Sequence, residues 1–124
     1  MAKRMNPVQW FEIPVNDLSR AREFYEYILE TQLSSDETSQ MKMLMFSGVD
    51  GAEGSSGALV KGEQYIPSHD GSVIYFTVHD IERVLDKVQQ KGGKVLVPKT
   101  SIGKWGNIAH FEDSEGNRVA LWSD

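Results

Sequence analysis

The stretch Val15-Asn16-Asp17-Leu18-Ser19-Arg20 decides the fold, because a similar stretch lies at an offset of 63 residues, Val78-His79-Asp80-Ile81-Glu82-Arg83. Before each copy an alternating apolar run, typical of a strand, leads through a short polar junction into a helical pattern. The chain has 124 residues, so the offset is about half of its length. We therefore predict a duplicated unit.

The first predicted unit covers residues 8–62 and has the order βαβββ. Residues 8–15 alternate in the manner of a strand, and Asn16 and Asp17 then supply side chains that cap a helix. Apolar residues at helical spacing continue to residue 29. Three more strands are expected at residues 31–35, 41–47 and 58–61, with a glycine-rich loop at 48–57 before the last.

The second predicted unit covers residues 72–124 and repeats this order. A strand at 72–78 precedes a helix that follows Asp80 and ends at Gly92-Gly93, where glycine accepts the left-handed backbone of a helix end. Further strands are expected at 95–98, 107–112 and 118–122, the last two joined by a turn at 113–117. Residues 62–71 are polar and read as the linker between the units.

Composition excludes several classes of function. The chain carries 13 Lys and Arg against 18 Asp and Glu, and no basic run marks a site for nucleic acid or an anionic membrane. It has no cysteine, so disulfides, thiolate metal sites and cysteine nucleophiles are excluded. No apolar run approaches the roughly 18 residues of a membrane span, and the basic start lacks the apolar core of a secretory signal. We expect a single cytoplasmic domain with no nucleic-acid or membrane partner.

Particular motifs carry a family resemblance. The segments Trp10-Phe11-Glu12-Ile13-Pro14-Val15-Asn16-Asp17-Leu18, Phe111-Glu112-Asp113-Ser114-Glu115-Gly116-Asn117 and Leu121-Trp122 resemble the vicinal-oxygen-chelate superfamily. This superfamily includes glyoxalase I, bleomycin-resistance proteins and extradiol dioxygenases, and the match is to the glyoxalase-like branch related to lactoylglutathione lyase. The resemblance implies an α+β fold in which paired βαβββ modules form an open, U-shaped, mostly antiparallel sheet with outer helices. It also implies a homodimer.

The resemblance also points to four positions at which metalloenzymes of this superfamily hold a divalent cation. In this sequence they are occupied by Trp10, Val73, Ala120 and a residue near Gly57. None of these side chains is a ligand for a divalent metal, which needs several oxygen or nitrogen donors. We therefore expect no metal cofactor.

Strand alternation predicts which side chains face the concave side of the sheet. The expected lining is aromatic with a few polar groups, as small-molecule sites usually are. The ligand-binding candidates are Trp10, Tyr75, Trp105, Glu112, Arg118 and Trp122. Trp105 belongs to a loop that could cover the cavity, and it could equally pack against the protein. Trp10 and Trp122 either stack on a planar ligand or serve the core and a dimer interface.

Two residues are candidates for acid–base chemistry. His110 titrates near neutral pH and is the preferred general acid or base, against the alternative of a histidine fixed by hydrogen bonds. Glu12 could be a base with a pKa raised by burial, or a carboxylate paired with Arg118. A substitute metal site made of Glu12, His110 and Glu112 is the weakest alternative, because its spacing is not diagnostic.

These observations lead to one functional hypothesis and two alternatives. The leading hypothesis is a glyoxalase-like protein that binds a small organic ligand in an aromatic cavity, with metal-independent acid–base catalysis by Glu12 or His110. The first alternative is a sequestering or resistance-type binding protein without chemistry. The second is a metal-dependent lyase or dioxygenase with non-standard ligands.

Overall fold

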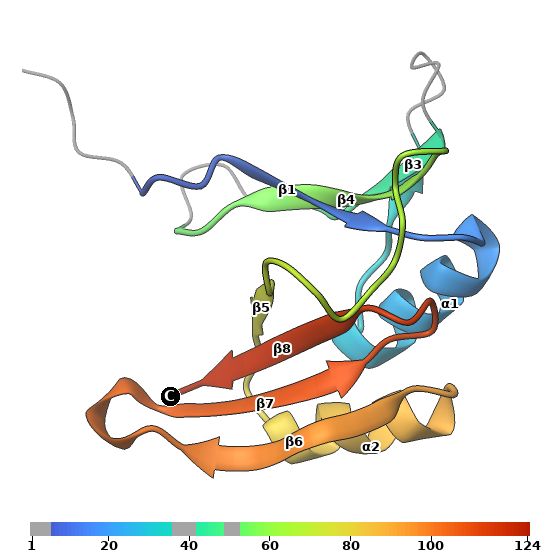
Figure 1. The fold of residues 1–124 in the computed structure, drawn as a ribbon. Coiled ribbons are helices and arrows are strands. Elements are labelled where there is room, and N and C mark those ends of the chain that lie inside the picture. The colour runs from blue at the N-terminus through green and yellow to red at the C-terminus, as the bar shows by residue number, and fades with distance from the viewer. Residues whose placement is uncertain (1–5, 36–41, 49–52) are drawn as a thin grey trace, which may run out of the picture.

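The computed structural model describes residues 6–35, 42–48 and 53–124, and these form eight strands and two α-helices (Figure 1). The first half contributes β1 (Trp10–Pro14), α1 (Leu18–Leu29), β2 (Ser34–Ser35), β3 (Lys42–Met45) and β4 (Ser56–Lys61). The second half contributes β5 (Tyr75–Thr77), α2 (Ile81–Gln90), β6 (Lys94–Ser101), the short 3-10 helix η1 (Gly103–Trp105), β7 (Asn107–Glu112) and β8 (Arg118–Ser123). The predicted α+β fold, with the order βαβββ in each half, is confirmed.

The strands form two four-stranded sheets with the same topology. The orders are β1-β4-β3-β2 and β5-β8-β7-β6. In each sheet the first strand runs parallel to the last strand of its half, and the other pairs are antiparallel. Each sheet is therefore mostly antiparallel, as predicted, and the open sheet consists of two separate four-stranded parts.

The two helices begin at equivalent aspartates. The side chain of Asp17 accepts a hydrogen bond from the backbone N–H of Arg20 at 3.0 Å, and that of Asp80 accepts from Arg83 at 3.1 Å. Such a cap satisfies an N–H group that has no partner within the helix. Each helix buries one apolar side: Ala21, Phe24, Tyr25 and Ile28 on α1, and Ile81, Val84, Leu85 and Val88 on α2.

One hydrophobic core joins the two halves. Phe24 of α1 packs on Phe111 of β7 with ring centroids 6.1 Å apart. The ring centroid of Phe76 of β5 lies 5.7 Å from that of Phe11 of β1 and 5.4 Å from that of Phe46. Because these contacts cross from one half of the chain to the other, the halves pack as one body.

The turn between β7 and β8 is fixed against the start of α1. The Glu115 side chain has no exposed surface and accepts hydrogen bonds from the backbone N–H groups of Asn16 and Asp17 at 2.8 and 2.9 Å. It also forms an ion pair with Arg20 at 2.7 Å. Beside it, the Tyr25 hydroxyl donates to buried Asp113 at 2.6 Å. These bonds lock the strand hairpin to the first helix.

Several element bounds differ from those predicted. The expected strands at 31–35 and 72–78 shrink to β2 and β5, which lie at sheet edges and pair on one side only. The expected strand at 95–98 extends to β6, where Pro98 lies within the register shift between Val97 and Thr100, a position that tolerates a missing N–H. Helix η1 replaces part of an expected loop. Met41 and residues 49–52 of the expected glycine-rich loop lie outside the described residues.

The segment between the units runs from residue 62 to residue 74, and we call it the linker. It passes between the two sheets before entering β5 (Figure 1). Ser68 ties it to the second sheet, since its N–H donates to the Asn117 side chain at 3.2 Å and its C=O accepts from the Arg118 N–H at 3.3 Å. No helix in the described part of the chain is long and apolar enough to cross a membrane.

Candidate functional site

Strand register places most of the predicted site residues on one face of the second sheet, the face away from the helices. His110 of β7 pairs with Ala120 of β8, and Ala120 pairs with Tyr75 of β5. Trp122 and the pair Glu112–Arg118 share this face, since side chains alternate along a strand. The intervening residues are buried toward α2: Ala109, Phe111, Val119 and Leu121. We call the side bearing Tyr75, His110, Glu112, Arg118 and Trp122 the open face.

His110 stands at the centre of a chain of hydrogen bonds on the open face. Its Nδ1 lies 3.0 Å from Arg118 Nη1, and its Nε2 lies 3.0 Å from the Tyr75 hydroxyl. The Tyr75 and His110 rings meet edge to face at 5.5 Å. Burial and, second, the positive charge of Arg118 lower the pKa of His110 below its usual value. Both effects favour the neutral form of the imidazole.

Glu112 has a different partner, which the sequence did not reveal. His69 of the linker lies with its Nε2 2.8 Å from Glu112 Oε1, and Lys94 lies 4.0 Å from the other oxygen. Sequence reasoning treats His69 as an ordinary loop residue. The chain brings it to the open face because Ser68 anchors the linker to the β7–β8 turn.

Glu12 lies on the first sheet, on the side opposite buried Ile13, and belongs to a separate cluster. Tyr65 of the linker donates to Glu12 Oε1 at 3.0 Å, and the Trp10 indole N–H lies 3.4 Å from Oε2. The hydrogen bond to Glu12 raises the pKa of Tyr65. The expected pairing of Glu12 with Arg118 is not formed. The two side chains instead line the same small cavity of about 110 Å³, under the linker.

Trp105 and Trp122 come together at the far end of the second sheet. The Trp122 indole N–H donates to the backbone carbonyl of Trp105 at 2.7 Å. Both line a cavity of about 290 Å³ with Lys104, whose ammonium lies 5.0 Å from the centre of the Trp105 ring. The Trp105 side chain remains 67% exposed, so it is available to a ligand rather than packed in the core.

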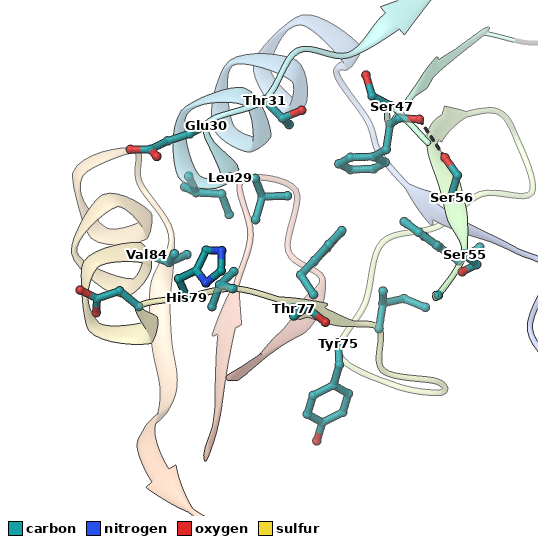
Figure 2. Close-up of a pocket in the computed structure, with 18 of the residues that line it drawn as sticks. Leu29, Glu30, Thr31, Ser47, Ser55, Ser56, Tyr75, Thr77, His79 and Val84 are labelled. Carbon is teal, nitrogen blue, oxygen red and sulfur yellow. Dashed lines mark hydrogen bonds between the residues drawn. The ribbon is translucent and has the colours of Figure 1, made fainter. Parts of the chain in front are cut away.

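A cavity of about 880 Å³, lined by residues of the described part of the chain, lies on the helix side of the sheets and was not predicted. Its apolar lining includes Phe11, Phe46 and Phe76. At its rim, Glu30 binds Arg83 and Lys87 at 2.6 Å each. Figure 2 shows that the Tyr75 ring, although its residue borders this cavity, points away from it. The cavity and the open face are thus separate candidate sites.

The residues present do not fit the divalent metal that the resemblance implies. Trp10 offers only an indole N–H, Ala120 is fully buried, and a side chain at Gly57 would meet the Phe11 carbonyl at 2.4 Å. Glu12, His110 and Glu112 do not converge either, because each is bonded to a different partner. Within residues 6–35, 42–48 and 53–124, no three His, Asp or Glu side chains form a group able to hold a metal ion.

Two curated relatives match part of the chain. Both are named "Putative glyoxylase CFP32", one from Mycobacterium bovis and one from Mycobacterium tuberculosis, and each is 40% identical over 48 residues. The matched region is 39% of this chain and only 18% of each relative's length.

Solved structures match nearly the whole chain. A glyoxalase/bleomycin resistance protein from Albidiferax ferrireducens is 17% identical with a TM-score of 0.75, covering 96% of this chain and 100% of that one. TnmS3, an antibiotic binding protein from Streptomyces, is 25% identical with a TM-score of 0.70, covering 98% of each chain.

The family model for these proteins matches residues 7–121, which is nearly the full length. It includes the motifs on which the resemblance was based, except Trp122, and the fold agrees with that of the solved structures. This chain belongs to the Glyoxalase/Bleomycin resistance protein/Dioxygenase superfamily.

Proposed function

We propose that this protein binds a small organic ligand with an aromatic ring on the open face. The observation that carries the proposal is the exposed aromatic surface beside the polar chain of Arg118, His110 and Tyr75. The Tyr75 side chain is 49% exposed, although an aromatic ring is normally among the most favourable groups to bury. Apolar surface with a few fixed polar groups is the usual composition of a ligand site. The likeness to TnmS3, which is named as an antibiotic binding protein, supports this proposal.

The test is an NMR screen of small aromatic acids, phenols and neutral aromatics against the isotope-labelled protein. We expect bound compounds to shift the amide signals of β5, β7 and β8. The matched variants are Trp122→Ala on the open face and Thr31→Ala at the helix-side cavity. Loss of affinity only in Trp122→Ala supports the proposal. Loss only in Thr31→Ala would move the site to the helix-side cavity, and an absence of binders would contradict the function.

We propose metal-independent proton transfer as a second function of the same face. The lowered pKa of His110 favours it, because only an unprotonated imidazole can act as a base; its Nδ1 accepts a proton once it is released from the hydrogen bond to Arg118. Glu12 is the second candidate, since it borders the same small cavity as Arg118. Turnover should survive a chelator and fall about 100-fold or more in His110→Asn or Glu12→Gln, the usual range for a general acid or base. Unchanged turnover in both variants would leave binding without chemistry.

The metal content of the protein tests whether its function is independent of metal. The untagged protein would be grown with Ni, Zn, Mn and Fe, dialysed, and analysed for its elements. We expect only background metal, because the implied ligand positions carry no suitable donors. A content near one ion per chain would revive the lyase or dioxygenase alternative.

We further propose that the protein is a homodimer. Strands β1 and β5 each pair with a neighbour on one side only, and unpaired edges are normally covered. Exposed Val8 and Trp10 add apolar surface at the β1 edge. Light scattering after size exclusion should give twice the chain mass, and a monomer mass at all concentrations would contradict the proposal.

A further inference from the structure

We infer that the Tyr75 hydroxyl is the group that contacts the ligand, and that it donates a hydrogen bond to an ionised oxygen of an aromatic organic anion. His110 and Arg118 are then positioning residues that act through Tyr75. This inference rests on the proposed function, because it names the ligand class of that same face.

The first step is the placement of protons along the chain. An arginine side chain donates hydrogen bonds and does not accept them. Because Arg118 Nη1 lies 3.0 Å from His110 Nδ1, that nitrogen must be the acceptor. The single proton of the neutral ring is then on Nε2. It points to the Tyr75 oxygen, 3.0 Å away.

The second step concerns the proton of Tyr75 itself. Its oxygen already accepts from His110, so its own O–H is free to donate to a different group. The ring is half exposed and points away from the helix-side cavity (Figure 2). The donor is therefore directed at the open face, where a ligand can reach it.

The third step is the aromatic surface beside that donor. Tyr75 pairs across the sheet with Ala120, whose small side chain lets the Tyr75 and His110 rings meet across β8, while Tyr75 itself stays half exposed. The next pair on the same face of these strands is Thr77 with Trp122. Diagonal neighbours on one sheet face lie about 7–8 Å apart, within reach of aromatic side chains. An aromatic ring on Trp122 can thus present an oxygen to Tyr75.

The fourth step is charge. Arg118 faces Glu112 in the strand register, but the Glu112 carboxylate is bonded to His69. Within the described part of the chain, Arg118 forms no ion pair with a carboxylate. Its positive charge polarises the hydrogen bonds that lead from Arg118 through His110 to Tyr75, since hydrogen bonds in a series strengthen one another. An anionic oxygen is favoured over a neutral one at such a donor.

The proton placement can be tested without a ligand. Nitrogen-15 spectra of the histidine rings distinguish the two neutral tautomers. We expect His110 to carry its proton on Nε2, and the variant Arg118→Met to lose this single preference. A proton on Nδ1 in the unmodified protein would overturn the inference whatever the protein binds.

Ligand class is tested with benzoate and its neutral analogue benzamide, by NMR titration of the unmodified protein, Tyr75→Phe and the control Tyr27→Phe. The Tyr27 hydroxyl bonds to Gln90 between the helices, away from the open face. We expect Tyr75→Phe to weaken benzoate binding about tenfold, the worth of a hydrogen bond to a charged group, and to leave benzamide within about twofold. Tyr27→Phe should change neither.

Two results would overturn the inference while leaving the proposed function standing. One is equal benzoate affinity in Tyr75→Phe and the unmodified protein. The other is binding of benzamide as tight as that of benzoate. If neither these probes nor the aromatic screen gives binding on the open face, the proposed function itself fails.

Discussion

The Glu115 side chain accepts more hydrogen bonds than the side chain of any predicted site residue, and its role is structural. Burial alone would raise its pKa. The hydrogen bonds from Arg20, from the backbone of Asp17 and Asn16, and from Ser114 outweigh burial, so the net effect lowers the pKa. A carboxyl group whose pKa is lower in the folded state stabilises the fold above its unfolded pKa and loses that effect as the pH falls.

Glu115→Gln tests this at the residue scale. At pH 7 the substitution should lower the free energy of unfolding by about 2 kcal/mol, because it removes a charged acceptor from buried donors. The difference should shrink as the pH falls through the range where Glu115 is protonated. Urea denaturation across pH measures it, with exposed Glu23→Gln as the control. Burial raises the pKa of neighbouring Asp113, which acts in the opposite direction but cancels in the comparison with the variant.

Helix η1 depends on the glycine that follows it. Gly106 has a φ of 105° and follows η1 directly. A Cβ atom there would lie 2.3 Å from the Ser123 carbonyl and 3.2 Å from the Trp122 indole nitrogen. Gly103 also has a positive φ, but the space around it is open.

These two glycines give a matched prediction for the element. Gly103→Ala should lower the free energy of unfolding by about 1 kcal/mol, since it adds only the strain of a left-handed backbone. Gly106→Ala should lower it by more than about 2 kcal/mol, because this strain combines with a backbone clash. It should also break the hydrogen bond between Trp122 and Trp105. Thermal denaturation and tryptophan fluorescence check both variants, and equal costs would contradict the assigned clash.

Elements governed by local chemistry could be predicted from sequence. Capping chemistry predicts the helix that follows Asp17 and the helix that follows Asp80. Strand alternation predicts the β7–β8 hairpin and the placement of His110 and Trp122 on one face. The partners of Glu12 and Glu112 could not be predicted, since Tyr65 and His69 meet them through the path of the linker in space. The helix-side cavity was missed because a core pattern does not reveal how tightly its side chains pack.

At the scale of the whole molecule, the two sheets depend on a shared aromatic contact. Phe76 of the second sheet touches Phe11, Phe46 and Tyr25 of the first half. Edge-to-face and tilted ring pairs add to the free energy of burying the rings. This contact therefore couples the cores of the two halves.

Phe76→Ala should therefore lower the free energy of unfolding of the entire chain by about 3 kcal/mol. We expect one cooperative transition in the unmodified protein, with circular dichroism and tryptophan fluorescence changing together. Hydrogen exchange should then show faster opening in both sheets of the variant. Faster exchange in the second sheet alone would indicate that the halves are independent.

The linker gives this molecule an internal competitor. Its Tyr65 and His69 already occupy Glu12 and Glu112, and Ser68 holds it in place. A ligand that needs either carboxylate must first displace a segment of the same chain. Its measured affinity is then the intrinsic affinity multiplied by the fraction of molecules in which the segment has moved aside. Substitutions in the linker would accordingly tune affinity without touching the ligand.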